Sequence, residues 1–126
     1  MFYVADTHAW VFYLLNKLPE KANDAFKSVE KGESIMFVPT IALAECIYLI
    51  ESKKIALNLK ELFVKFETGG NFVPVSLNFE IIKEVSKIKL EEIHDRIIVA
   101  TARILDAKLV TKDSDITNSK LIETVW

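Results

Sequence analysis

The chain has 126 residues, of which 51% are hydrophobic and 27% charged, and its formal net charge is −2. This balance excludes a disordered protein, and a content of three Gly and three Pro leaves no stretch for a flexible linker. We therefore expect a single globular domain over residues 1–126. The near-neutral charge gives no sign of a strongly basic nucleic-acid-binding protein.

Cys46 is the only cysteine, which excludes an intramolecular disulfide and a zinc site built from cysteines. We expect it to be buried as a small hydrophobic residue. The apolar N-terminal segment carries Asp6 and His8 and lacks the basic start of a signal peptide. No uncharged run approaches the ~20 residues that a membrane-spanning helix needs. These features predict a cytoplasmic protein without membrane contact.

Short apolar runs alternate with longer segments of helical period along the whole chain. The runs predict five strands, at Phe2–Ala5, Ile35–Val38, Phe72–Val75, Leu109–Thr111 and Glu123–Trp126. The segments between them predict helices over His8–Asn16, Glu20–Lys31, Thr40–Ile50, Asn58–Thr68 (ended by Gly69-Gly70), Asn78–Lys89 and His94–Asp106. Strands and helices that alternate in this way pair in parallel through right-handed crossovers. The sequence thus predicts an α/β fold, a three-layer α/β/α sandwich with a central parallel sheet of about five strands.

Four acidic residues stand at positions that the core does not explain. Asp6 follows the first strand and Asp113 follows the fourth. These strands are neighbours in the usual doubly wound orders, so both carboxylates should meet at one edge of the sheet. Asp95 begins an apolar helix, and Glu45 lies inside the apolar stretch Ile41–Tyr48.

Each of these acids also has a purely structural interpretation. Asp6 is a good helix cap, Asp95 a favourable charge at a helix N-terminus, and Asp113 and Asp115 typical turn residues. Glu45 could be paired with a lysine. Carboxylates that converge on one cleft, however, repel one another unless a cation binds between them. Oxygen ligands without His or Cys favour Mg²⁺ or Mn²⁺ over zinc.

Three segments, VADTHAW, TIALAECIYL and HDRIIVATARILDAKLVTKDSDI, resemble the PIN-domain nucleases, in particular the VapC-type ribonuclease toxins. The resemblance extends over the whole chain. It matches the family's four acidic site positions to Asp6, Glu45, Asp95 and Asp113, and the accompanying hydroxyl residues to Thr7 and Thr111.

This resemblance implies a metal-dependent endoribonuclease that cleaves single-stranded RNA with one or two Mg²⁺ or Mn²⁺ ions. Asp6 and Asp113 would be direct ligands with Asp95 beside them. Glu45 would bind through water or act as a base, and both roles stay open. Asp115 is either an accessory ligand or a plain loop acid.

The resemblance also implies partners, namely a second copy of the chain in a homodimer and a small antitoxin protein. The helix Asn58–Thr68 is the expected contact surface, through its residues Leu59, Leu62, Phe63 and Phe66.

Other residues near the predicted site have two interpretations each. Arg96 could contact the scissile phosphate or form an ion pair with Glu92 or Asp6. For His8 and His94, a surface or packing position near a helix start is favoured over a role as zinc ligand or base. The same holds for Trp10 and Phe12, for which core or dimer packing is favoured over base stacking. Lys53, Lys54 and Lys112 could supply positive charge near the cleft.

Two related fold families do not fit the acidic pattern. A phosphorelay receiver domain needs paired acids after its first strand and an Asp after its third, where this chain has Pro74, Val75 and Ser76. A haloacid-dehalogenase-like phosphatase needs a second Asp at position 8, which is His8. The remaining alternative is a PIN fold that serves as a catalytically weak binding or regulatory module.

Overall fold

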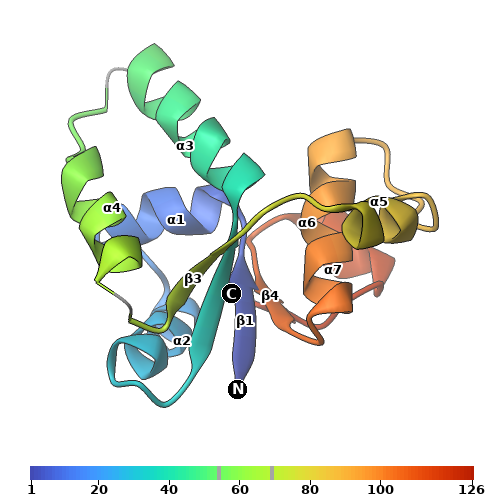
Figure 1. Cartoon of the computed structure of the whole chain (residues 1–126), viewed down its shortest axis with the longest axis horizontal. Helices are drawn as coiled ribbons and strands as arrows, with labels where there is room; N and C mark the ends of the chain where they lie inside the picture. The colour runs from blue at the N-terminus through green and yellow to red at the C-terminus, as the bar shows by residue number, and fades with distance from the viewer. Residues whose placement is uncertain (54, 69) are drawn as a thin grey trace.

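The computed structural model describes residues 1–53, 55–68 and 70–126 and places a parallel sheet between two layers of helices (Figure 1). The strands are β1 (Phe2–Ala5), β2 (Ile35–Pro39), β3 (Phe72–Val75), β4 (Lys108–Val110) and β5 (Thr124–Val125). They lie in the order β3-β2-β1-β4-β5, and all four pairings are parallel. The predicted α/β/α sandwich with five strands is confirmed.

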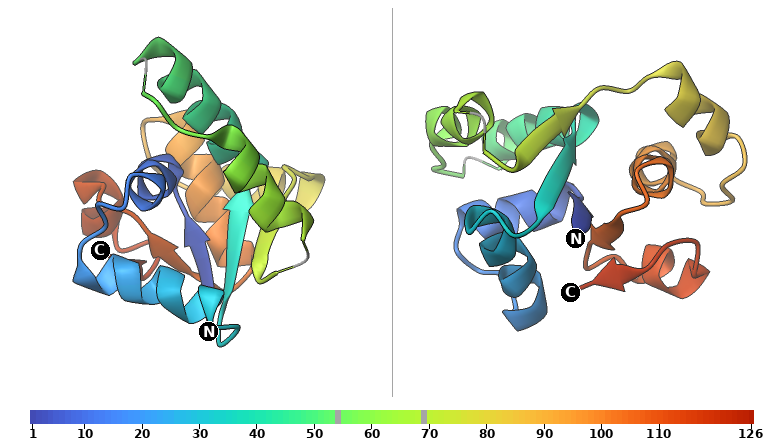
Figure 2. Two further views of the ribbon diagram at one scale, coloured as in Figure 1. Left: turned by 90° about the vertical axis from the view of Figure 1, so that its left-hand side faces the viewer. Right: turned by 60° about the horizontal axis from the view of Figure 1, so that its bottom comes forward.

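The helices divide between the two faces of the sheet (Figures 1 and 2). One face carries α1 (Thr7–Leu14), α2 (Glu20–Glu30), α3 (Thr40–Ser52) and α4 (Leu59–Glu67). The other face carries α5 (Phe79–Val85), α6 (Ile93–Ile104) and α7 (Ser114–Ser119). Because β1, β2 and β3 consist almost entirely of apolar residues, the sheet is covered on both sides, as parallel sheets are.

Successive residues of the central strand β1 pack into the two opposite layers. Tyr3 and Ala5 join the core under α1 and α2, and Val4 joins the core under α6. This alternation follows from the two-residue period of a strand. It fixes the register of β1 at the centre of the fold and so the point where Asp6 leaves the sheet.

Trp10 is the centre of the first core layer, with 0% of its surface exposed. Its ring meets those of Tyr13, Phe26, Phe66 and Phe72 at centroid distances of 5.2 to 5.8 Å. Phe12 packs against Trp126 at 5.6 Å. Packing, rather than base stacking, therefore accounts for Trp10 and Phe12 of α1.

Two elements at the C-terminal half differ from the sequence prediction. The helix predicted over Asn78–Lys89 ends at Val85, because the chain then turns through a 3.0 Å hydrogen bond from the Lys87 amide to the Glu84 carbonyl. The short helix α7 was expected as a turn, since Ser, Asp, Thr and Asn favour helices weakly. Its stability comes from burial of Ile116 and from Asp113, which caps the helix rather than forming a simple turn.

The predicted contact surface on α4 is smaller than the sequence indicated. Leu62 is buried, and Leu59 and Phe66 are partly buried against the core. Phe63 and Val64 remain exposed. The helix ends at Glu67, and Gly69, half of the predicted Gly69-Gly70 stop, lies outside the described residues.

Among the helices of the described ranges, none combines the length and the apolar character that crossing a bilayer requires.

Candidate active site

The site lies where the order of the strands reverses, between β1 and β4. Asp6 follows β1 directly, and its backbone amide donates a 3.1 Å hydrogen bond to the carbonyl of Val110 at the end of β4. Asp113 follows β4 after two further residues. Ligands of open α/β sheets bind in the crevice at this switch point. In Figure 1 this is the upper end of the sheet, where α1 and α3 begin.

All four predicted acids line one cavity of about 340 Å³. Asp6 comes from the start of α1, Glu45 from α3, Asp95 from the first turn of α6, and Asp113 from the start of α7. The rest of the wall is formed by Thr7, His8, Tyr48, Leu49, Glu92 and Ile98. Residues up to 107 positions apart in the sequence thus share one small volume.

Asp6 is held by hydrogen bonds to both of its carboxylate oxygens. Oδ1 accepts a 2.9 Å bond from the Ala9 amide, which caps α1, and Oδ2 accepts a short bond from the Thr111 hydroxyl. The Thr111 oxygen in turn accepts from the Asp113 amide at 3.0 Å. Burial raises the pKa of Asp6, although the bonds from Thr111 and Ala9 favour its charged form. The structural interpretation of Asp6 as a cap is therefore correct, and it coexists with a place on the cavity wall.

Glu45 lies between two helices other than its own. Its Oε1 accepts a 3.1 Å hydrogen bond from the Thr7 hydroxyl of α1, and its Oε2 lies 3.8 Å from Nδ1 of His94 in α6. In the described part of the chain it has no lysine partner. Thr7 and His94 thus orient this carboxylate toward the cavity.

The electrostatics of the site are clearest at Asp95. Partial burial raises its pKa to about 6, and the negative charges of Asp113, Glu92, Asp6 and Glu45 add to the effect. Nearby carboxylates disfavour one another's charged forms in this way when no cation separates them. Burial is thus the larger cause of the shift, and the neighbouring acids add to it.

Glu92 is an acid of this cavity that the sequence did not mark as a site residue. Its side chain caps α6 by accepting a 3.0 Å hydrogen bond from the Asp95 amide, and it lies 3.1 Å from Nδ1 of His94. Slight burial disfavours its charge, but the amides of His94 and Asp95 and the nearby imidazole outweigh it and lower the pKa of Glu92. Glutamate is an unusual residue at the start of a helix, and this was the one feature of the sequence that could have marked Glu92 as a site residue.

The donor chemistry of the wall fits a hard divalent cation. The acids offer carboxylate oxygens, which are ligands that Mg²⁺ and Mn²⁺ prefer, and the hydroxyls of Thr7 and Thr111 hold two of these carboxylates by hydrogen bonds. Within the described ranges, no three His, Cys, Asp or Glu side chains stand close enough together to hold one ion as they are arranged. An ion would therefore have to draw mutually repelling carboxylates together.

Of the other predicted neighbours, His8 lines this cavity, whereas Asp115, Arg96 and Lys112 lie outside its wall. Asp115 lines a second cavity of about 570 Å³ that shares Glu92 and Asp95 with the first. The Nε of Arg96 donates to the Leu90 carbonyl, and this residue makes no ion pair with Glu92 or Asp6 in the described structure. Lys112 lies over the Phe12 ring at 4.8 Å, and Lys54 is outside the described residues.

Cys46 is fully buried behind the site, where its Sγ approaches the Thr7 carbonyl at 3.5 Å. Burial, and to a lesser degree Glu45 and Asp6, raise the pKa of its thiol to about 12. The expectation of an unreactive buried hydrophobic residue is thus supported.

A sequence model of the PIN domain matches residues 3–120. The chain therefore belongs to the PIN domain family. No curated protein matches it in sequence.

Several solved structures share its fold. VapBC2 from Rickettsia felis, bound to a DNA fragment from its promoter, is similar with a TM-score of 0.71 and 17% identity over 98% of this chain and 97% of that one. A toxin–antitoxin complex from Klebsiella pneumoniae has a TM-score of 0.65 and 16% identity over 95% and 94%. FitAcB from Neisseria gonorrhoeae has a TM-score of 0.62 and 18% identity over 97% and 95%. At these identities the likeness establishes the fold.

Proposed function

We propose that this protein is a metal-dependent endoribonuclease that cleaves single-stranded RNA and is the VapC-type toxin of a toxin–antitoxin pair. The observation that carries the proposal is the group of four carboxylates, from four different elements, on one cavity of a PIN domain. Burial, with a further contribution from the neighbouring acids, raises the pKa of Asp95 to about 6, and shifted pKa values of this kind are common at functional sites.

In this proposal Asp6, Asp95 and Asp113 hold one or two Mg²⁺ or Mn²⁺ ions, and Glu45 binds through water or acts as a base. When bound, such an ion supplies a water of lowered pKa and stabilises charge on the phosphate. Thr111 keeps Asp6 oriented and favours its charged form. Thr7 does the same for the orientation of Glu45. Arg96 and Asp115 are proposed as accessory groups only, since neither lines the cavity of the four acids.

The catalytic proposal is tested by cleavage of an unstructured RNA with Mn²⁺ or Mg²⁺, with and without EDTA. The informative variant is Asp6→Asn, because asparagine caps a helix as well as aspartate does and so preserves α1. Asp24→Asn, on the exposed side of α2, is the matched control. We expect EDTA-sensitive cleavage by the parent and the control, with a loss of at least about a hundredfold in Asp6→Asn. Absence of cleavage, or its survival in Asp6→Asn, would favour the binding-module alternative.

The proposed partners are a small antitoxin and a second copy of the chain, in the cytoplasm. The solved structures of similar fold include toxin–antitoxin complexes, and Phe63 and Val64 of α4 offer exposed apolar surface for a partner. Expression in a bacterial host should stop growth, and Asp6→Asn should remove the effect. Light scattering of the purified chain measures whether it is a dimer.

A further inference from the structure

The wall of the acidic cavity has a second, apolar side. Three residues on this wall are apolar or aromatic rather than acidic, namely Tyr48 and Leu49 of α3 and Ile98 of α6. A nucleotide has the same two-part chemistry, an anionic phosphate that a metal centre neutralises and an aromatic base that prefers an apolar surface. The cavity therefore has a place for each part.

Tyr48 is the part of this apolar side that is open to a ligand. Its exposed fraction is 70%. In the described structure its ring pairs with no other aromatic ring, and its hydroxyl forms no hydrogen bond. It lies three positions after Glu45 on α3, a spacing that places two side chains on one face of a helix about 5–6 Å apart at Cβ. The ring thus stands one helical turn from a carboxylate of the site.

The cavity also lacks the usual means of holding RNA. None of the described residues that line it is Lys or Arg. Affinity must then come from the neutralised acidic centre and from contacts to the bases. Stacking on an aromatic ring is such a contact, and it tolerates any sequence because every base has a π-face.

From these observations we infer that Tyr48 is a substrate-binding residue, on which a base next to the cleaved phosphate stacks. The inference rests on the proposed function, since it names how the same site would hold single-stranded RNA. Trp10 and Phe12, the aromatic residues near the site in the sequence, are occupied by packing, so Tyr48 takes the role that they do not fill.

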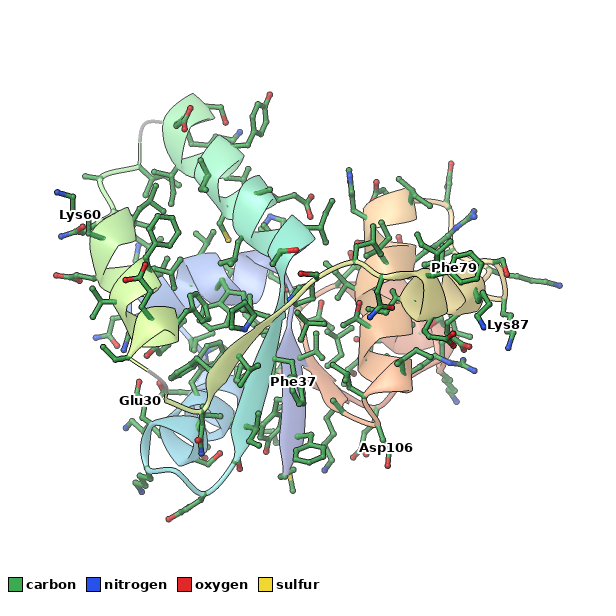
Figure 3. The ribbon with its side chains drawn as sticks, in the orientation of Figure 1. Glu30, Phe37, Lys60, Phe79, Lys87 and Asp106 are labelled. Atoms are coloured by element: carbon green, nitrogen blue, oxygen red, sulfur yellow. The ribbon has the colours of Figure 1, made fainter. Side chains whose placement is uncertain are left out.

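The kinetic test compares Tyr48→Ala, Tyr48→Phe and Tyr48→Trp in metal-dependent cleavage of a short unstructured oligoribonucleotide. We expect the KM of Tyr48→Ala to rise about tenfold while its kcat stays within about twofold, because a lost stacking contact weakens binding and leaves the reacting groups in place. Phenylalanine and tryptophan keep an aromatic face and should restore the parental KM. The matched control is Phe79→Ala on α5, a residue that is 72% exposed, lies away from α3 (Figure 3) and should leave KM unchanged.

A binding test separates this inference from the catalytic proposal. Tryptophan fluorescence of Tyr48→Trp, in an Asp6→Asn background that prevents cleavage, should be quenched by the oligoribonucleotide with Mn²⁺ present. An abasic ribose-phosphate chain of equal length should not quench it, and Phe79→Trp should not respond to either.

Quenching without cleavage by the parent would refute the nuclease and keep the stacking role. Parental cleavage with an unchanged KM in Tyr48→Ala would overturn the stacking role and keep the nuclease. A changed oligomeric state of Tyr48→Ala in light scattering, with unchanged KM, would assign the ring to a protein interface and equally overturn the inference.

Discussion

Replacing Asp95 by asparagine should stabilise the metal-free protein, although it removes a residue of the proposed site. Burial and four neighbouring acids raise the pKa of this carboxyl from 3.8 to about 6. For a fully buried group that difference corresponds to about 3 kcal/mol at neutral pH. Because the side chain is partly exposed, solvent screening reduces the figure to about 1 kcal/mol. For a chain of this size the gain corresponds to a rise in Tm of about 4 °C.

The size of this stabilisation depends on pH in a defined way. A carboxyl whose pKa is raised by folding is protonated more readily in the folded than in the unfolded state, so its cost is present above the folded value. That cost falls as pH drops from about 6 toward 3.8, and below the latter both states are protonated. The advantage of Asp95→Asn should therefore be seen at about pH 7 and largely disappear near pH 4.

Thermal melts in EDTA and in Mn²⁺ provide the assay. In EDTA, Asp95→Asn should melt above the parent. In Mn²⁺ the order should reverse, because only the parent keeps the full set of ligands, and a ligand bound to the folded state raises its stability. Asp24→Asn should match the parent in both conditions. A lower Tm for Asp95→Asn in EDTA at neutral pH, or an equal rise in the Asp24→Asn control, would refute the electrostatic reasoning.

Three further predictions concern the surroundings of the site. Thr111→Val removes the hydroxyl bond to the buried Asp6 carboxylate and should lower the free energy of unfolding by about 1–3 kcal/mol in a denaturant titration, whereas Thr40→Val, at an exposed threonine whose hydroxyl caps nothing in α3, should change it little. The rise in Tm caused by Mn²⁺ should shrink below about pH 6, because protons compete with the ion for Asp95; a constant rise down to about pH 4 would contradict this. Cys46, whose buried thiol has a pKa of about 12, should react with a thiol reagent only as fast as the protein unfolds, so labelling that is complete without denaturant would show that the burial is wrong.

Some of the site could be predicted from the sequence because it depends only on strand ends. Asp6 and Asp113 each follow an apolar strand, and parallel strands deliver their carboxyl ends to one edge of a sheet. The local chemistry of Asp6 was equally legible, since aspartate before a helix caps it. The helix α7, in contrast, could not be predicted from its local sequence. Its residues form helices only weakly, and the helix is stabilised by the Asp113 cap and by burial of Ile116.

Other parts of the site depend on how helices from distant parts of the chain approach one another. His94 faces both Glu92 on its own helix and Glu45 on α3 across the cavity. No local pattern in either segment fixes that approach, because helix period determines which side is buried and not where its ends point. Tyr48 is the clearest case, since at helical spacing it reads as another apolar core residue of α3, and the structure leaves it exposed on the cavity wall.

The sequence by itself determined the α/β/α fold, the switch point and the residue types that meet there, since strand alternation and strand ends are written in short segments of the chain. Only the tertiary structure showed that these acids line one cavity together with Glu92, that burial and, to a lesser degree, their mutual repulsion raise the pKa of Asp95, and that an aromatic ring stands beside them. These properties depend on distances between side chains up to 107 positions apart, and folding alone sets those distances.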